Sequence, residues 1–201
     1  SGGSGEQAVL MAACGQMGQF YNLPSGIAAG MTDSKIPDAQ SGYEKGYTVA
    51  LAGHSGANLV YESAGMHASL LGCCLESYVI DNDMLGAINR TVRGIEVNAE
   101  TLSLDPIRDV CLDGPGHYLG HEQTLKRMQS DYLYPTVGDR ENINNWIEQG
   151  STDSIQRAHL KLKEILKTHF PNNWDEDTDR KIREKSPIGL PRNRMQPLDI
   201  S

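Results

Sequence analysis

The feature that most constrains this fold is a repeated order of elements along the first part of the chain. Residues 4–20 carry apolar side chains at helical spacing, and short apolar runs follow at 26–31 and 57–61 with a second helical stretch between them. Helices that alternate with short strands are typical of a parallel sheet with helical crossovers. The sequence therefore predicts an α/β fold.

Each apolar run ends in polar side chains. The first run is followed by residues 32–35, which include Asp33 and Lys35, and the second ends at Tyr61 and Glu62. The carboxyl ends of parallel strands meet at one edge of a sheet, where α/β proteins place their functional groups. We expect Asp33, Tyr61 and Glu62 to share a cavity at this edge.

The length of the chain limits how much of an α/β fold it holds. A complete (β/α)8 barrel takes about 250 residues, whereas only the first part of these 201 residues shows βα units. We expect residues 1–130 to be the C-terminal half of such a TIM barrel, with the missing half upstream. Residues 131–201 are predicted to be a helical C-terminal extension with an extended tail. A smaller open α/β sheet is the alternative.

Composition argues against several classes of protein. The net charge is −8 and no polybasic patch occurs, so a nucleic-acid partner is not expected. No apolar stretch has the length of a membrane span, and no signal segment is recognisable. The four cysteines lack CxxC spacing, which favours reduced thiols in a cytoplasm. The first five residues, SGGSG, are either a cloning remnant or a native βα loop.

Three runs of the sequence carry a family resemblance. They are residues 30–35 (GMTDSK), residues 53–95 and residues 113–125 (DGPGHYLGHEQTL). In this order they resemble the trimethylamine methyltransferase family of corrinoid-dependent methyltransferases. The resemblance covers nearly the whole chain up to its helical tail. Because family members are full-length barrels of more than twice this size, the chain resembles their C-terminal portion.

The resemblance implies an activity and a partner. A methyl group would pass from trimethylamine, or from a quaternary amine such as glycine betaine, to the Co(I) of a corrinoid held by a partner protein. A homo-oligomer is also expected. The alternative is a non-catalytic fragment or homologue that only docks a corrinoid protein or a sister chain.

Some members of this family contain pyrrolysine, and the resemblance places that residue at or near Lys35. A pyrrolysine there would be written as lysine in a one-letter sequence. The chemistry separates the two cases, because a quaternary ammonium already carries a neutral amine as leaving group. A tertiary amine must first be protonated or bonded to an electrophile, which an ordinary lysine does not provide. If residue 35 is lysine, we expect a quaternary amine as substrate, or no methyl transfer.

The candidate site residues each have a structural alternative. Asp33, Lys35 and Glu62 are the catalytic candidates, although Asp33 is also suited to helix capping and Glu62 to a surface pair. Tyr61 is a substrate-binding candidate, because its ring face suits a methylammonium group; a core tyrosine is the alternative.

Two histidines complete the set of candidates. His117 and His121 are predicted to share one face of a helix and to contribute to substrate binding at the corrinoid entrance. Helix capping is the alternative interpretation. Their spacing lacks the HExxH order and a third ligand, so no metal site is expected.

Overall fold

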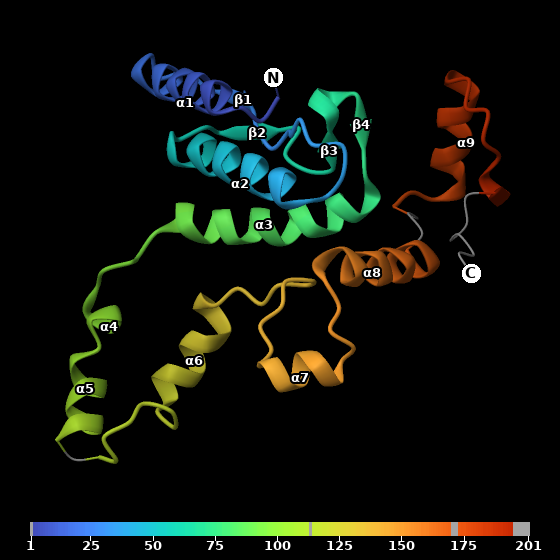
Figure 1. The fold of residues 1–201 in the computed structure, drawn as a ribbon. Coiled ribbons are helices and arrows are strands. Elements are labelled where there is room, and N and C mark those ends of the chain that lie inside the picture. Colours follow the sequence, from blue (N-terminus) through green and yellow to red (C-terminus); the bar gives the residue numbers. More distant parts are fainter. Residues whose placement is uncertain (1, 113, 170–172, 195–201) are drawn as a thin grey trace. The chain divides into compact units, whose positions relative to one another are not determined.

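The computed structural model describes residues 2–112, 114–169 and 173–194 (Figure 1). The chain divides into two compact units, residues 1–139 and residues 140–201. The first unit contains α1 (Gly5–Phe20), β1 (Gly26–Ala28), α2 (Ala39–His54), β2 (Leu59–Tyr61), β3 (Met66–His67), η1 (Ala68–Leu70), β4 (Gly72–Cys73), α3 (Leu75–Arg93), α4 (Ala99–Leu102), α5 (Leu104–Cys111) and α6 (Glu122–Asp131).

The predicted parallel pairing is confirmed. β1 pairs with β2 in parallel, with Gly26 opposite Leu59 and Ala28 opposite Tyr61, and α2 forms the crossover between them. β3 and β4 form a separate short antiparallel pair. The result is a mixed, helix-rich α/β unit, and the described residues do not form a closed barrel.

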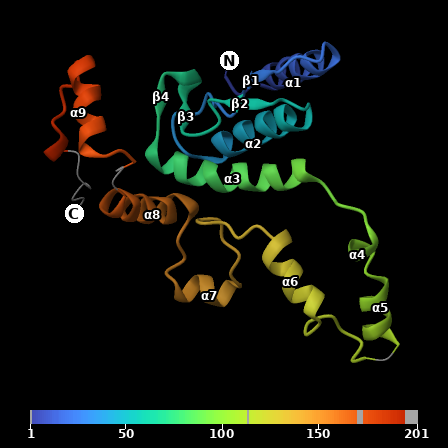
Figure 2. The same ribbon diagram turned by 180° about the vertical axis from the view of Figure 1, so that it is seen from behind.

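The hydrophobic core lies between the helices and one face of the two-stranded sheet. Helix α2 packs against α1 and against α3, and it lies between them in both views of the ribbon (Figures 1 and 2). The buried cluster at this junction consists of Ile27, Ala29, Val49, Ala52 and Ile88. Because neighbouring side chains of a strand point to opposite faces, Ile27 faces the helices while Gly26 and Ala28 face away.

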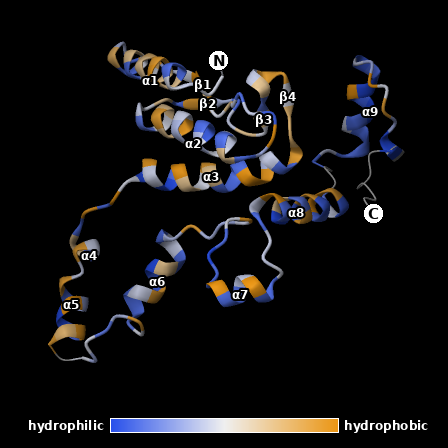
Figure 3. Cartoon of the chain, in the orientation of Figure 1, coloured by the Kyte–Doolittle hydropathy of each residue, from blue (hydrophilic) through white to orange (hydrophobic). Residues whose placement is uncertain are grey.

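The other face of the sheet is open. Leu59 is 61% exposed and Tyr61 is 45% exposed, whereas Val60 between them packs against the core. Apolar side chains are also exposed along α1, where Figure 3 shows hydrophobic residues interspersed with hydrophilic ones. This unit therefore buries one face of its sheet and leaves the opposite face uncovered.

Capping side chains begin the helices that flank the sheet. The Ser4 side chain accepts a hydrogen bond from the Gln7 backbone N–H at 3.2 Å, which starts α1 as predicted. Asp38 caps α2 in the same way. The aspartate after Val79 and Ile80 has the local pattern of an N-cap, which predicts a helix that begins at Asp81. This prediction is wrong, because α3 already begins at Leu75 and Asp81 is buried within it.

The described part of the second unit is helical. It contains α7 (Ile143–Glu148), α8 (Ser154–Thr168), α9 (Glu176–Lys185) and η2 (Arg192–Arg194). Asp153 and Gln156 form a capping box at the start of α8. The expected extended tail lies partly outside the described residues. None of the helices in the described part of the chain is long and apolar enough to cross a membrane.

Candidate functional site

Three separate segments meet at the carboxyl edge of β1. The residues that follow β1 contact the η1 turn, because the Ala68 backbone N–H donates to the Ser34 carbonyl at 3.0 Å and the Ser69 N–H donates to the Thr32 carbonyl at 3.0 Å. The loop before α1 joins them, since the Gly2 N–H donates to the Ser69 hydroxyl at 3.1 Å. This edge therefore gathers residues from the loop after β1, from the η1 turn between β3 and β4, and from the segment before α1.

Asp33 lies at the centre of these contacts. The Ser69 hydroxyl donates to its carboxylate, and the Asp33 backbone N–H donates to the Glu44 carboxylate at 2.9 Å. The side chain of Asp33 is half-buried. A carboxylate fixed in this way at a partly open edge is a suitable counter-charge for a cationic ligand.

Glu44 supports this edge from inside α2. Its Oε2 atom accepts a 2.5 Å hydrogen bond from the Thr32 hydroxyl, and its Oε1 atom accepts one from the Gln40 amide at 2.9 Å. Both Glu44 and Thr32 are buried. Buried polar groups that are satisfied by several hydrogen bonds hold a unique geometry, so Glu44 fixes the backbone on which Asp33 is mounted.

The η1 turn adopts a backbone conformation that side chains disfavour. Ala68, Ser69 and Leu70 all have positive φ angles, of 49°, 53° and 73°. Left-handed residues other than glycine, asparagine and aspartate are uncommon, and such strain concentrates at functional sites. The two backbone hydrogen bonds to the Thr32 and Ser34 carbonyls are what hold the turn in place.

Lys35 lies next to this cluster on the surface. Its side chain is exposed, and its Nζ atom donates to the Asp33 carbonyl at 2.6 Å. The amine of residue 35 is therefore at the same edge as the Asp33 carboxylate.

Tyr61 and Glu62 point to different sides of the sheet. The Tyr61 ring lies over Gly26 on the open face. Glu62, whose φ is 64°, lies on the same side as Val60, and both residues line a cleft of about 680 Å³ together with Tyr78. Neither Asp33 nor Tyr61 lines this cleft. The structure thus does not bring the three side chains into this one cavity, although their backbones share the carboxyl edge.

The two histidines are not on one helix face, and that expectation was wrong. His117 lies in the loop before α6, and His121 is the N-cap of α6, where its Nδ1 atom accepts from the Gln123 N–H at 3.1 Å. The preceding glycine- and proline-containing loop keeps the chain from entering the helix earlier. In the described ranges, no group of three or more His, Cys, Asp or Glu side chains is placed to hold a metal ion.

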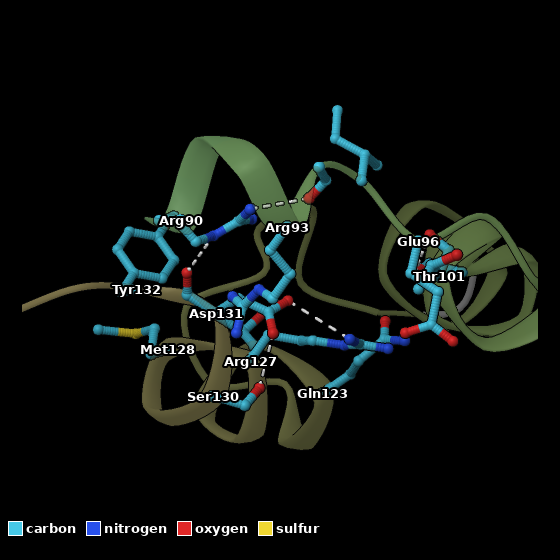
Figure 4. A pocket seen from close by; sticks show the side chains of 14 residues that line it. Arg90, Arg93, Glu96, Thr101, Gln123, Arg127, Met128, Ser130, Asp131 and Tyr132 are labelled. Carbon is cyan, nitrogen blue, oxygen red and sulfur yellow. Dashed lines mark hydrogen bonds and ion pairs between the residues drawn. The ribbon is translucent and has the colours of Figure 1, made fainter. Parts of the chain in front are cut away.

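A second cleft, of about 690 Å³, lies between the end of α3 and α6 and is rich in arginine (Figure 4). The guanidinium groups of Arg90 and Arg127 in this cleft bond to other parts of the chain. Arg90 donates to the carbonyls of Asp131 and Gly94, both at 2.9 Å, and Arg127 pairs with Glu100 and with the Asp131 carboxylate. We infer that these contacts hold α6 against the end of α3 and against α4.

Sequence reasoning did not identify Thr32, Glu44 or Ser69 as site residues. Ser69 lies in a stretch, residues 66–75, whose structure the pattern left undecided. Glu44 has the spacing of an ordinary helical residue. The one available signal is that Thr32 and Ser34 flank Asp33 within a polar run that follows an apolar strand.

Comparison with known proteins agrees with the resemblance. A family model described as trimethylamine methyltransferase matches residues 1–185. The chain belongs to the trimethylamine methyltransferase family. Among its relatives, a trimethylamine methyltransferase of Methanosarcina thermophila is 38% identical over 176 residues, which cover 87% of this chain and 35% of the relative. A glycine betaine methyltransferase of Desulfitobacterium hafniense is 31% identical over 182 residues, which cover 90% of this chain and 37% of the relative.

The chain spans about a third of the length of these two relatives. The family match also includes the first five residues. Because Gly2 bonds to Ser69 and the Tyr47 hydroxyl donates to the Gly3 carbonyl, the glycine-rich start is integrated into the fold. These observations favour a native loop over a cloning remnant.

Proposed function

We propose that this chain is the C-terminal portion of a corrinoid-dependent methyltransferase that removes a methyl group from trimethylamine or from a quaternary amine. In this proposal residues 1–130 are part of a (β/α)8 barrel, and residues 131–201 are its helical extension. Family membership over residues 1–185 supports the reaction class. The uncovered face and free edges of the β1–β2 pair are consistent with a larger sheet.

The observation that carries the proposal is the group of contacts around Asp33, which Ser69 and Glu44 make. A methylated ammonium is a cation whose charge cannot be satisfied by hydrogen bonds when every hydrogen on nitrogen is replaced by carbon. It therefore needs a nearby carboxylate or an aromatic face. Asp33 provides a carboxylate that is held by Ser69, on a backbone that Glu44 fixes.

The corrinoid in this proposal belongs to a partner protein, and its Co(I) ion supplies the nucleophile that accepts the methyl group. The residues present fit such an arrangement, because Lys35, Tyr61 and Glu62 at the carboxyl edge are exposed to an approaching partner. The contribution of this chain is to hold and orient the amine and to exclude water. In this scheme Asp33 holds the ammonium charge, whereas Glu62 lines a separate cleft and does not contact the same ammonium.

Residue 35 decides between the two kinds of amine. A lysine offers no electrophile to a tertiary amine, so lysine at this position favours a quaternary substrate such as glycine betaine. A pyrrolysine favours trimethylamine. Mass analysis of the peptide that carries residue 35 separates the two, because pyrrolysine adds a ring to the lysine Nζ atom.

The proposal is tested with the purified protein that carries this chain. Reduced Co(I) corrinoid protein is mixed with trimethylamine, with glycine betaine and with no amine, and loss of the Co(I) absorbance is followed. A loss of Co(I) absorbance that depends on one of the amines supports the proposed methyltransferase activity. No loss with either amine, together with binding to the corrinoid protein, would support the alternative of a docking homologue.

Asp33→Asn provides the matched test of the site. We expect it to raise the KM for the amine by about tenfold or more, as for the loss of one charge-assisted contact. Asp105→Asn is the control, because the Asp105 side chain is 89% exposed in α5. Equal kinetics for the two variants would remove Asp33 from the proposed site.

A further inference from the structure

Helices α2 and α3 bury a complete ion pair between them. The Lys45 Nζ atom lies 2.7 Å from the Asp81 Oδ2 atom, and the two side chains are 1% and 6% exposed. Lys45 is among the largest fully buried side chains in the described part of the chain. Placing both charges away from water costs several kcal/mol per ion before the pair forms, and an apolar pair of similar volume often packs two helices equally well. Helix packing alone therefore does not account for this pair.

The pair has a third member outside the two helices. The Gly65 backbone N–H donates to the same Asp81 Oδ2 atom at 2.7 Å, and this hydrogen bond is buried. Gly65 ends the turn that follows β2, in which Glu62 has a left-handed backbone. Asp81 thus connects the helix pair directly to the strand-end turn, residues 62–65.

The space around Gly65 leaves this turn little freedom. Gly65 has a φ of 76°, and a Cβ atom there would lie 2.3 Å from the Tyr78 ring. On its other side, Ser63 packs so closely on Gly30 that a Cβ at Gly30 would lie 2.6 Å from the Ser63 Cα. The turn therefore packs between the end of β1 and α3, and the Asp81 carboxylate accepts a hydrogen bond from it.

One helical turn before Asp81, Ser77 makes a second contact between α3 and the segment that follows β2. The Ser77 hydroxyl lies 2.7 Å from the His67 Nε2 atom, and the His67 Nδ1 atom lies 3.2 Å from the Ser34 carbonyl. His67 immediately precedes the η1 turn that carries Ser69, the residue whose hydroxyl donates to Asp33. Two side chains of α3, Asp81 and Ser77, thus bond to Gly65 and to His67 in the segment between Glu62 and Ser69.

We propose that the Asp81 side-chain oxygen, buried beside Lys45, positions the strand-end turn, residues 62–65, and through it the edge that carries Glu62 and Ser69. Asp81 is a positioning residue, since it is not exposed to a ligand. The expected effect on methyl transfer rests on the proposed function. The expected effect on the conformation of residues 62–65 is independent of it.

The experiment compares two double variants of the full protein that both remove the buried charges. K45M/D81N keeps an acceptor oxygen for the Gly65 N–H, whereas K45M/D81L has similar bulk and no acceptor. Thermal melting confirms that both are folded. Hydrogen exchange of peptides covering residues 60–70 then reports the turn, and steady-state methyl transfer reports kcat and KM separately. If K45M/D81L is not recovered folded, K45M/D81A takes its place in the same comparison.

We expect the Gly65 region to exchange about tenfold faster in K45M/D81L than in K45M/D81N, with the rest of the protein alike. We also expect kcat to fall about tenfold between the same two variants. Equal exchange in both variants would overturn the inference, whatever the activity. Faster exchange in a protein that transfers no methyl group even as wild type supports the positioning of the turn and rejects the proposed function.

Discussion

The Asp83 carboxylate lies 2.7 Å from the backbone N–H of Val137, a residue 54 positions further along the chain. The same carboxylate accepts hydrogen bonds from the N–H groups of Thr136 at 2.7 Å and Gly138 at 2.9 Å. A single side chain of α3 therefore fixes the turn that leads out of the first unit.

Replacement of Asp83 is expected to destabilise this unit. Asp83→Ala removes the acceptor of three N–H groups; water can replace it at the exposed Thr136, whereas Val137 is buried, so the loss is expected to cost about 1–3 kcal/mol. Asp83→Asn keeps one acceptor oxygen and should cost less. Urea unfolding of the two variants measures the difference, and equal stabilities of Asp83→Ala and wild type would show that the turn does not depend on this carboxylate.

The same contact predicts a loss of stability in acid. Burial raises the pKa of Asp83, but the N–H groups of Thr136, Val137 and Gly138 outweigh it, so the pKa lies below the ordinary value of 3.8. The carboxylate thus contributes stability above pH 3.8, and this contribution is lost as the pH falls through the lower folded pKa. Urea midpoints below pH 4 should fall more steeply for wild type than for Asp83→Asn.

His67 predicts a second pH dependence, at higher pH. Its burial, and secondly the nearby charge of Lys45, lower its pKa below the ordinary value of 6.5. The unfolded chain therefore takes up a proton at about pH 6.5 that the folded chain does not. Stability should be full above this pH and should decrease as the pH falls toward the lower folded pKa. Unfolding at pH 7.5 and 5.5 checks this, and His67→Gln should show a smaller difference between the two.

Two glycines offer a matched pair of substitutions. Gly30 has a φ of 97°, and a Cβ there would meet the Ser63 backbone, so Gly30→Ala should destabilise the protein and disturb the carboxyl edge. Gly46 is in the middle of α2 with nothing within 4 Å of an added Cβ. Gly46→Ala should stabilise by about 1 kcal/mol. Melting temperatures that move in the same direction for both would contradict this.

Two serines test the edge itself with matched backbones. Ser69 and Ser103 have left-handed φ angles of 53° and 56°, so alanine costs a similar backbone strain at both. Only Ser69 bonds to Asp33 and to the Gly2 N–H, whereas the Ser103 hydroxyl reaches local carbonyls. We expect Ser69→Ala to lower kcat/KM for the amine by about fivefold or more, and Ser103→Ala to leave it unchanged. Similar kinetics for both would separate Ser69 from the site.

The sequence predicted those parts of the fold that depend on local signals. Helices α1 and α8 follow from apolar spacing and from the capping residues Ser4 and Asp153, and the parallel β1–β2 pair follows from the alternation of elements. Asp81 was misplaced because an aspartate after an apolar run has the same local appearance whether it caps a helix or pairs with a distant lysine. Its partner Lys45 is 36 residues away, and no local pattern contains that contact.

The place of Asp33 in the fold was predictable from the sequence, but the residues that contact it were not. A polar run after β1 indicated the carboxyl edge, and Asp33 lies there in contact with Ser69 and Glu44. The Tyr61 and Glu62 side chains diverge because neighbouring side chains of a strand point to opposite faces, so Glu62 lies on the side of Val60 while Tyr61 lies on the open face. Helix α6 begins after His121, which is its N-cap, so His117 lies outside the helix. The spacing of four residues between the two histidines therefore does not place them on one helix face.

The uncovered β1–β2 pair has a practical consequence for handling this chain. Neither strand has another strand neighbour in the described part of the chain, and Leu59 and Tyr61 present an apolar surface above them. Bare strand borders next to exposed apolar side chains favour intermolecular strand addition. Precipitation of a concentrated solution should therefore begin at these two short strands, and a charged residue in place of Leu59 should delay it.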